Sequence, residues 1–344
     1  MATYATLLLP SANRVYADSS ARLMTAELGV LNRAALEGRI SDIKQTSIGG
    51  VPYLTFEADE LSEADLALLA NLSSIYGMFR IEGDLLAPKE LHRLDLYDDD
   101  LITIQKYQGK TNEQFTKLLL NVTLWSSNFA GEMARRRFSV LDPLGGRGTT
   151  LNQAIMYGYD AAGVDIDKRD FEAYSGFIRT YLKRKRLKHQ AEVAPVRRQR
   201  RVLGRQLEVT LAPSKERYKA GDTQRLSFCN IDTTEARDVY AAGSFDLLVT
   251  DAPYGVQHGS RTEGEGLRRA PLDLLRAGLP VWMELLRSGG AMGIAWNTLV
   301  AKREEVAAEL RAAGLEVFDS GPYRNFEHRV DQAILRDVIV ARKP

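Results

Sequence analysis

The sequence of 344 residues contains a single cysteine, Cys229, and only four histidines. One thiol cannot form an internal disulfide or supply a cysteine-rich zinc site, so we interpret Cys229 as a small buried residue. The histidines are His92, His189, His258 and His328. No two of them are three or four residues apart, the spacing that places side chains on one helix face. We therefore expect no metal site.

Long apolar runs are also missing. None approaches the roughly 20 residues that a helix needs to span a bilayer. The stretch Met1–Asn13 lacks a basic start and has an apolar run only at Leu7–Leu9, which argues against a secretory signal. We expect a cytoplasmic protein that does not associate with membranes. With 44% apolar and 26% charged residues, the composition is that of a globular chain long enough for two domains.

Basic residues are concentrated in one part of the chain. Residues 181–225 carry 14 Lys and Arg against 4 Asp and Glu, whereas the whole chain has a net charge of only +1. The clusters Lys183–Arg186 and Arg197–Arg201 lie within this segment. Such an asymmetry predicts a polyanionic partner, although a solvated loop without a partner would have a similar composition.

The first part of the chain alternates between strand and helix patterns. Gly49-Gly50 supplies the positive φ angles of a tight hairpin turn, and Ser62 with Asp65 forms a variant of the helix capping box. The expected order is strand, helix, strand, strand, helix, strand, over Thr6–Leu9, Ala21–Glu37, Ile43–Ile48, Val51–Ala58, a helix from Ser62, and Ile75–Ile81. This order predicts a small ferredoxin-like α+β domain over residues 1–95.

Residues 96–344 have the pattern of an α/β domain. After an acidic linker at Asp95–Asp100, we expect a strand at Leu101–Gln105 and a helix from Asn112. Short apolar runs then alternate with helical segments, at Phe138–Leu141, Ala161–Asp165, Leu226–Asn230, Asp246–Thr250 and Ala291–Ala295. This alternation predicts a Rossmann-like, doubly wound parallel sheet. Leu315–Phe318 and Arg336–Ala341 should close the sheet as a hairpin with an antiparallel edge strand.

The basic residues fall in an insertion at about 183–224, between the second and third of these strands, where the connection is usually short. Within the insertion we expect Leu207–Leu211 and Arg217–Lys219 to form a hairpin.

A glycine-rich turn, Asp142 to Thr149, lies between a predicted strand and the predicted helix Leu151–Tyr157. Glycines at such a turn let a ligand approach the backbone closely. Asp165 ends the next strand 19 residues after Gly146, near the spacing at which an acid reaches ribose hydroxyls. These features predict a nucleoside-containing cofactor, and a dinucleotide would fit them as well.

The fourth strand continues into Asp251-Ala252-Pro253-Tyr254-Gly255, which resembles the Asp-Pro-Pro-Tyr motif of amino-group methyltransferases. An exocyclic base amine is a poor nucleophile because its lone pair is delocalised into the ring. A carboxylate and a backbone carbonyl can accept its two hydrogens and favour the localised lone pair. Tyr254 would stack on the base, and His258 is a candidate substrate contact.

Together these motifs resemble the class I S-adenosylmethionine-dependent methyltransferases, and within them the tRNA guanine-N2 methyltransferase family of putative RNA methylases. The resemblance covers residues 101–344 and includes an upstream segment, Lys110–Glu113. It implies S-adenosylmethionine as the cofactor, bound by Thr111, Asp142, Gly145, Gly146, Gly148, Thr149, Asp165 (ribose) and Asp232 (adenine). It also implies that Asp251, Pro253 and Tyr254 are catalytic.

Two features depart from that family. Ala252 replaces the first proline of the motif, and the roughly 95 N-terminal residues are too few for both a ferredoxin-like module and a THUMP domain. We expect methylation of an exocyclic amine, with guanine N2 in tRNA as first choice and RNA bound through Lys183–Arg225. The alternatives are a DNA adenine-N6 or cytosine-N4 methyltransferase, a small-molecule N-methyltransferase, and a non-catalytic RNA-binding module.

Overall fold

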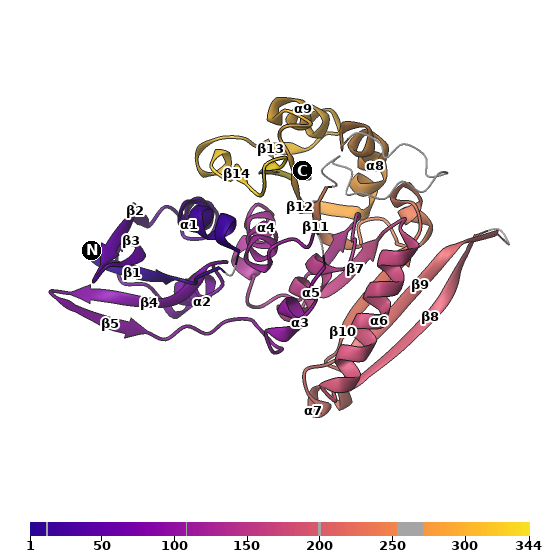
Figure 1. Cartoon of the computed structure of the whole chain (residues 1–344), viewed down its shortest axis with the longest axis horizontal. Coiled ribbons are helices and arrows are strands. Elements are labelled where there is room, and N and C mark those ends of the chain that lie inside the picture. Colours follow the sequence, from indigo (N-terminus) through magenta and orange to yellow (C-terminus); the bar gives the residue numbers. More distant parts are fainter. Residues whose placement is uncertain (12, 108, 199–200, 253–270) are drawn as a thin grey trace.

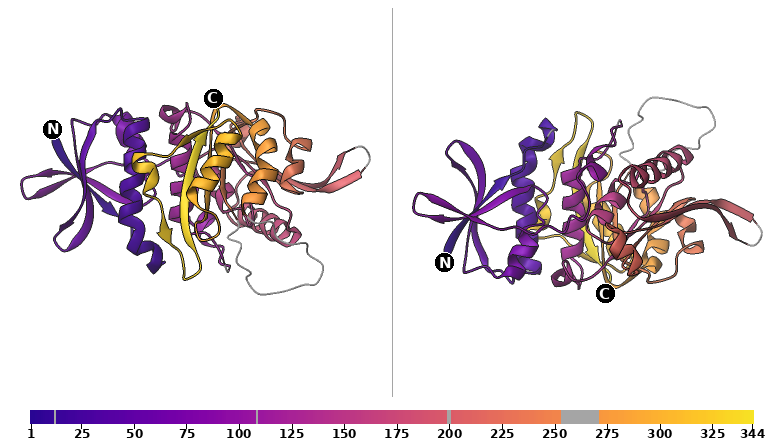
Figure 2. Two further views of the ribbon diagram at one scale, coloured as in Figure 1. Left: turned by 90° about the horizontal axis from the view of Figure 1, so that it is seen from above. Right: turned by 90° about the horizontal axis from the view of Figure 1, so that it is seen from below.

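The computed structural model describes residues 1–344 except 12, 108, 199–200 and 253–270. Two sheets make up the architecture, and the helix α1 (Arg14–Ala34) lies between them (Figures 1 and 2). Among the described helices, none is both long enough and apolar enough to cross a membrane.

The first sheet has five strands in the order β2-β3-β1-β4-β5, and all neighbours are antiparallel. Its elements are β1 (Ala2–Leu8), α1, β2 (Ile40–Ile48), β3 (Val51–Ala58), α2 (Glu63–Leu69), β4 (Ile75–Glu82) and β5 (Leu85–Lys89). Gly49 and Gly50 have φ angles of 59° and 81° in the predicted hairpin. Ser62 and Asp65 form the predicted capping box. The expected order of elements is therefore confirmed, with β5 added at the edge.

Within the described residues, the second sheet contains ten strands: nine follow the order β13-β15-β12-β11-β6-β7-β10-β9-β8, and β14 pairs with β15. Its strands are β6 (Ser139–Asp142), β7 (Asp160–Val164), β8 (His189–Arg198), β9 (Arg201–Leu211), β10 (Gln224–Asn230), β11 (Phe245–Asp251), β12 (Leu286–Asn297), β13 (Glu316–Phe318), β14 (His328–Arg329) and β15 (Leu335–Arg342). The five central strands are parallel to one another. All five strands predicted for the parallel sheet are therefore present.

Helices cover both faces of this sheet, and each face has its own apolar core. The helices are α3 (Asp100–Thr103), α4 (Glu113–Trp125), α5 (Thr149–Met156), α6 (Lys168–Arg184), α7 (Lys215–Lys219), α8 (Pro271–Leu285) and α9 (Arg303–Ala312), with short 3-10 turns η1 (Ala130–Glu132), η2 (Thr233–Asp238) and η3 (Gly321–Arg324). Residues of α4, α5 and α6 share one core with the first sheet. Residues of η2, α8 and α9 form the other core.

Three expectations about secondary structure are wrong. Leu101–Gln105 is not a strand, because Asp100–Thr103 forms the helix α3, whose acidic start favours a helix N-terminus and whose Leu101 is buried. The antiparallel strand β15 is not at the edge. It lies between β12 and β13, because its apolar side chains are buried on both faces.

The third correction concerns the insertion. Leu207–Leu211 is a strand, but its partners are β8 and β10, and Arg217–Lys219 belongs to the helix α7. Ser214 caps that helix by accepting a hydrogen bond from the backbone N–H of Arg217 at 3.2 Å, which starts a helix instead of a strand.

A buried carboxyl group joins α1 to the second sheet's helices. Glu27 of α1 has no exposed surface, and it accepts hydrogen bonds from Asn121 Nδ2 of α4 at 2.8 Å and from the Ser73 backbone N–H at 3.0 Å. Burial raises the pKa of Glu27 to about 7, against the attraction of its hydrogen-bond donors. The protonated form is therefore favoured in the folded protein relative to the unfolded chain.

This shift predicts that stability falls as pH rises. A group with a raised folded-state pKa contributes its full stabilisation below its unfolded pKa of 4.5 and loses it as pH rises through about 7. Replacing Glu27→Gln should reduce the loss in unfolding free energy between about pH 5 and about pH 8 by roughly 3 kcal/mol. Urea denaturation at the two pH values measures this difference. The exposed Glu63→Gln on α2 is the control, and equal pH dependence in both variants would contradict the assignment.

Candidate functional site

The glycine-rich turn after β6 has a conformation that requires its glycines. Gly146 and Gly148 have φ angles of 49° and 77°, in the left-handed region that favours glycine. A Cβ atom on Gly148 would lie 2.2 Å from the ring of Tyr174 on α6. The Gly145 N–H donates to the carbonyl of Val164 at 2.8 Å, which ties the turn to the end of β7.

Asp142 ends β6 and is buried beneath this turn. Its Oδ1 accepts hydrogen bonds from the Leu144 N–H at 3.1 Å and from Thr250 Oγ1 of β11 at 2.9 Å. Burial raises the pKa of Asp142 to about 7, and the negative charge of Asp165 adds to that shift. The carboxyl group is thus held at the junction of two strand ends.

Asp165, just beyond β7, contacts the turn directly. Its Oδ2 accepts from the Gly146 N–H at 2.7 Å, and its Oδ1 accepts from the Asp167 N–H at 2.7 Å. Burial raises the pKa of Asp165 to about 6. The two features predicted from their spacing in the sequence are therefore in contact.

Beyond β10, Asp232 caps the 3-10 turn η2 by accepting from the backbone and hydroxyl of Thr234, at 2.9 and 2.7 Å. Asn230 was not predicted as a site residue. Its Nδ2 donates to the carbonyls of Asp165 and Ile166, each at 3.0 Å, and so fixes the end of β10 against the end of β7. Its position at the end of a predicted strand was the feature of the sequence that could have indicated this role.

Asp251 ends β11, and residues from two distant segments contact it. Its Oδ2 accepts a hydrogen bond from Thr111 Oγ1 at 2.7 Å and lies 3.2 Å from the Arg336 guanidinium of β15. Arg336 is buried and stacks over the Phe115 ring at 4.4 Å. Arg336 was not predicted as a site residue. The adjacent charged residues Arg336 and Asp337, directly before the apolar run at 338–341, were the available signal in the sequence. Thr111, predicted as a cofactor contact, here positions the carboxylate of Asp251.

The segment before α4 also reaches the start of α5. The Tyr107 hydroxyl lies 3.0 Å from Thr149 Oγ1, and the Arg147 guanidinium packs over the Tyr107 ring at 4.7 Å. Thr149 is the first residue of α5, so this contact places an aromatic side chain beside the glycine-rich turn. Tyr107 was not predicted from the sequence.

The remaining predicted residues differ in what the structure describes. Ala252 is buried, and its N–H donates to the carbonyl of Ala295 on β12 at 2.8 Å. Pro253, Tyr254 and His258 lie outside the described residues.

The carboxylates of Asp142, Asp165 and Asp251 lie at the carboxyl ends of three neighbouring parallel strands or just beyond them. This is the edge at which α/β sheets bind ligands.

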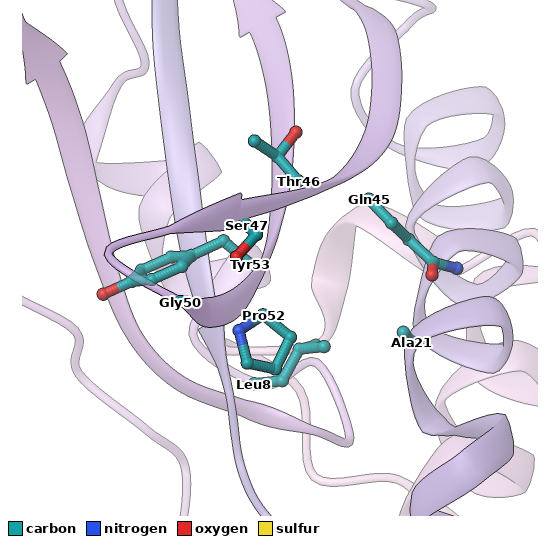
Figure 3. Close-up of a pocket in the computed structure, with 8 residues that line it drawn as sticks. All are labelled: Leu8, Ala21, Gln45, Thr46, Ser47, Gly50, Pro52 and Tyr53. Atoms are coloured by element: carbon teal, nitrogen blue, oxygen red, sulfur yellow. The ribbon is translucent and has the colours of Figure 1, made fainter.

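Two cavities lie elsewhere. One of about 270 Å³ is formed by the β2–β3 hairpin and Ala21 of α1, with Gln45 and Pro52 among its lining residues (Figure 3). The other, of about 700 Å³, lies between α6 and the α3 segment and is lined by Phe177 and Tyr181 together with Asp100 of α3. None of the three carboxylates lines either of these cavities.

Comparisons with known proteins found no matching family model and no matching curated protein. Solved structures that resemble the chain include the precorrin-6y C5,15-methyltransferase of Geobacter metallireducens, 12% identical, with 73% of this chain and 98% of that chain covered and a TM-score of 0.37. A putative rRNA methylase of Clostridium thermocellum is 15% identical, with 60% and 89% covered and a TM-score of 0.35. A TehB-like SAM-dependent methyltransferase of Corynebacterium glutamicum is 16% identical, with 62% and 83% covered and a TM-score of 0.33. At this level of similarity, the strand order and the site geometry are the grounds for a functional assignment.

The turn yields a prediction about stability. In Gly148→Ala the new methyl group collides with Tyr174 in a left-handed backbone conformation, and we expect a loss of about 3 kcal/mol in unfolding free energy. Gly146→Ala is the matched control, because its Cβ would meet nothing within 4 Å and only the backbone strain of about 1 kcal/mol remains. Chemical denaturation compares the unfolding free energies of the two variants. Equal losses would show that the collision with Tyr174 adds nothing to the backbone strain.

Proposed function

We propose that the chain is an S-adenosylmethionine-dependent methyltransferase whose acceptor is an exocyclic amine of a nucleic-acid base. The observation that carries this proposal is the alignment of Asp142, Asp165 and Asp251 at adjacent strand ends of one parallel sheet. The order β10-β7-β6-β11-β12-β15-β13, with β15 antiparallel, supports a class I methyltransferase sheet.

The residues on this edge fit the proposed cofactor. Asp142 and the turn residues Gly145, Gly146, Gly148 and Thr149 would hold the methionine part, and Asp165 would accept from the ribose hydroxyls. Asp232 would contact the adenine. When bound, S-adenosylmethionine supplies a methyl group on a positively charged sulfur. Two carboxyl groups whose pKa values are raised by desolvation suit a cationic ligand, because its charge favours their ionised form.

Asp251 would accept a hydrogen from the target amine, and the carbonyl of Ala252 or Pro253 would accept the other. Thr111 and Arg336 contact Oδ2 of Asp251, and these two contacts orient the carboxylate toward a fixed position. Tyr254 would stack on the base. Arg336 of β15 acts through the carboxylate of Asp251 and is therefore a positioning residue.

For the substrate we propose RNA, with guanine N2 in tRNA as first choice and the basic segment Lys183–Arg225 as its contact.

We also propose that residues 1–95 form a ferredoxin-like domain and residues 96–344 the methyltransferase domain. The antiparallel order β2-β3-β1-β4 supports the first of these assignments.

The cofactor proposal predicts pH-dependent binding. As pH falls through about 7 and about 6, Asp142 and Asp165 become protonated and no longer attract a cation. Isothermal titration calorimetry should show S-adenosylmethionine binding about tenfold more weakly at about pH 6 than at about pH 8. Asp142→Asn should reduce this dependence. Absence of binding by the unaltered protein at both pH values would refute the proposed cofactor.

The amine proposal predicts that Asp251→Asn lowers methyl transfer by roughly 100-fold or more, because the variant no longer offers a carboxylate to the amine. Binding of S-adenosylmethionine should stay within a factor of about three. Transfer of labelled methyl to RNA, followed by nucleoside mass spectrometry, measures the rate and identifies the base. Asp273→Asn, on the exposed face of α8, is the control. Full activity of Asp251→Asn would exclude the proposed catalytic role.

A further inference from the structure

The basic segment, continuous in the sequence, is divided in space. Lys183–Arg186 lies at the C-terminal end of α6, next to the start of β8, whereas Arg197, Arg198 and Arg201 lie at the far end of the β8–β9 hairpin. The strand His189–Arg198 separates the two clusters by about 30 Å at the usual rise per residue. The paired strands extend away from the body of the molecule in both views of Figure 2.

The register places only one of these clusters beside the candidate site. Asn230, the last residue of β10, pairs with Arg205 of β9, and Cys229 aligns with Val164, the last residue of β7. Residues Arg201–Gly204 therefore extend about 15 Å beyond the carboxyl ends of the parallel strands. That is the edge at which Asp142, Asp165 and Asp251 stand, whereas Lys183–Arg186 is at the opposite edge.

Contacts with β10, η2 and α6 hold the hairpin in this direction. A Cβ atom on Gly204 would lie 1.8 Å from the carbonyl oxygen of Asn230, so the backbones of β9 and β10 approach each other here at a distance that only glycine permits. Arg198 forms an ion pair with Asp238 of η2, and Arg205 lies 3.5 Å from Glu172 of α6. The direction of the hairpin is therefore set by the same segments that border the site.

We propose that the β8–β9 hairpin is a docking arm that binds the phosphate backbone of the RNA substrate through Arg197 and Arg201, and that Lys183–Arg186 is not part of this surface. The inference rests on the proposed function and specifies its partner surface. Arg197, Arg198, Arg201 and Arg205 are all exposed, and the guanidinium fork matches phosphate geometry better than an ammonium group does. The arm is four strands from β11, a distance of about 20 Å.

The test compares two variants that each remove two exposed positive charges from the full chain. Arg197→Gln/Arg201→Gln alters the arm, and Lys183→Gln/Arg184→Gln alters the opposite cluster. The probes are a synthetic RNA hairpin and a DNA duplex of equal charge, with affinities measured over a series of salt concentrations. The arm variant should bind the RNA hairpin roughly tenfold or more weakly, with the slope of log affinity against log salt reduced by about two, while the control variant stays within a factor of about two.

Equal losses in both variants, or no loss in the arm variant, would overturn the proposal. A loss of affinity confined to the DNA duplex would overturn the choice of RNA. A change in oligomeric state in the arm variant would overturn the RNA-binding role and indicate that β8 pairs with a second copy of the chain. Calorimetry with S-adenosylmethionine on the same samples separates the two proposals, since the arm variant should bind the cofactor as the unaltered protein does. If the unaltered protein binds no cofactor while the arm effect persists, the proposed function fails and the docking surface stands.

Discussion

The candidate site depends on the parallel pairing of β6 with β7 on one side and with β11 on the other. Parallel strands end at the same edge of a sheet, so residues from distant parts of the chain meet there without any long-range contact specific to them. Asp142 ends β6, Asp165 directly follows β7, and Asp251 ends β11. The hydrogen bond from Thr250 to Asp142 links the end of β11 to that of β6 directly.

Negative charge is concentrated at this edge and partly suppressed by burial. Desolvation is the largest cause of the raised pKa in both Asp142 and Asp165, and the negative charge of Asp165 adds to the shift of Asp142. Asp251 has a different environment, because Thr111 and Arg336 contact one of its oxygens. Two kinds of carboxyl group therefore share the edge. Burial raises the pKa values of Asp142 and Asp165, whereas contacts with Thr111 and Arg336 hold Asp251 in position.

The parts of the fold predicted correctly are those in which local residue chemistry and hydrophobic period agree. Gly49-Gly50, Ser62 with Asp65, and the apolar runs of the parallel strands are examples. The prediction of a strand at Leu101–Gln105 was wrong. Its β-branched residues favour a strand, whereas the burial of Leu101 and the preceding acidic residues favour one turn of helix. The pairing of β9 could not be read from its own residues, since several strands of similar pattern were available to it.

The sequence by itself determined the three short motifs, their order and the strand ends on which they lie, because glycine turns and alternating apolar runs are local properties. Only the tertiary structure decided which residues complete them. Arg336, Tyr107 and Asn230 come from segments distant in sequence from the residues that they contact. The tertiary structure also separated the basic segment into two clusters at opposite edges of the sheet. A strand of ten residues carries the chain across the whole sheet, so charges that are neighbours in the sequence can face different surfaces.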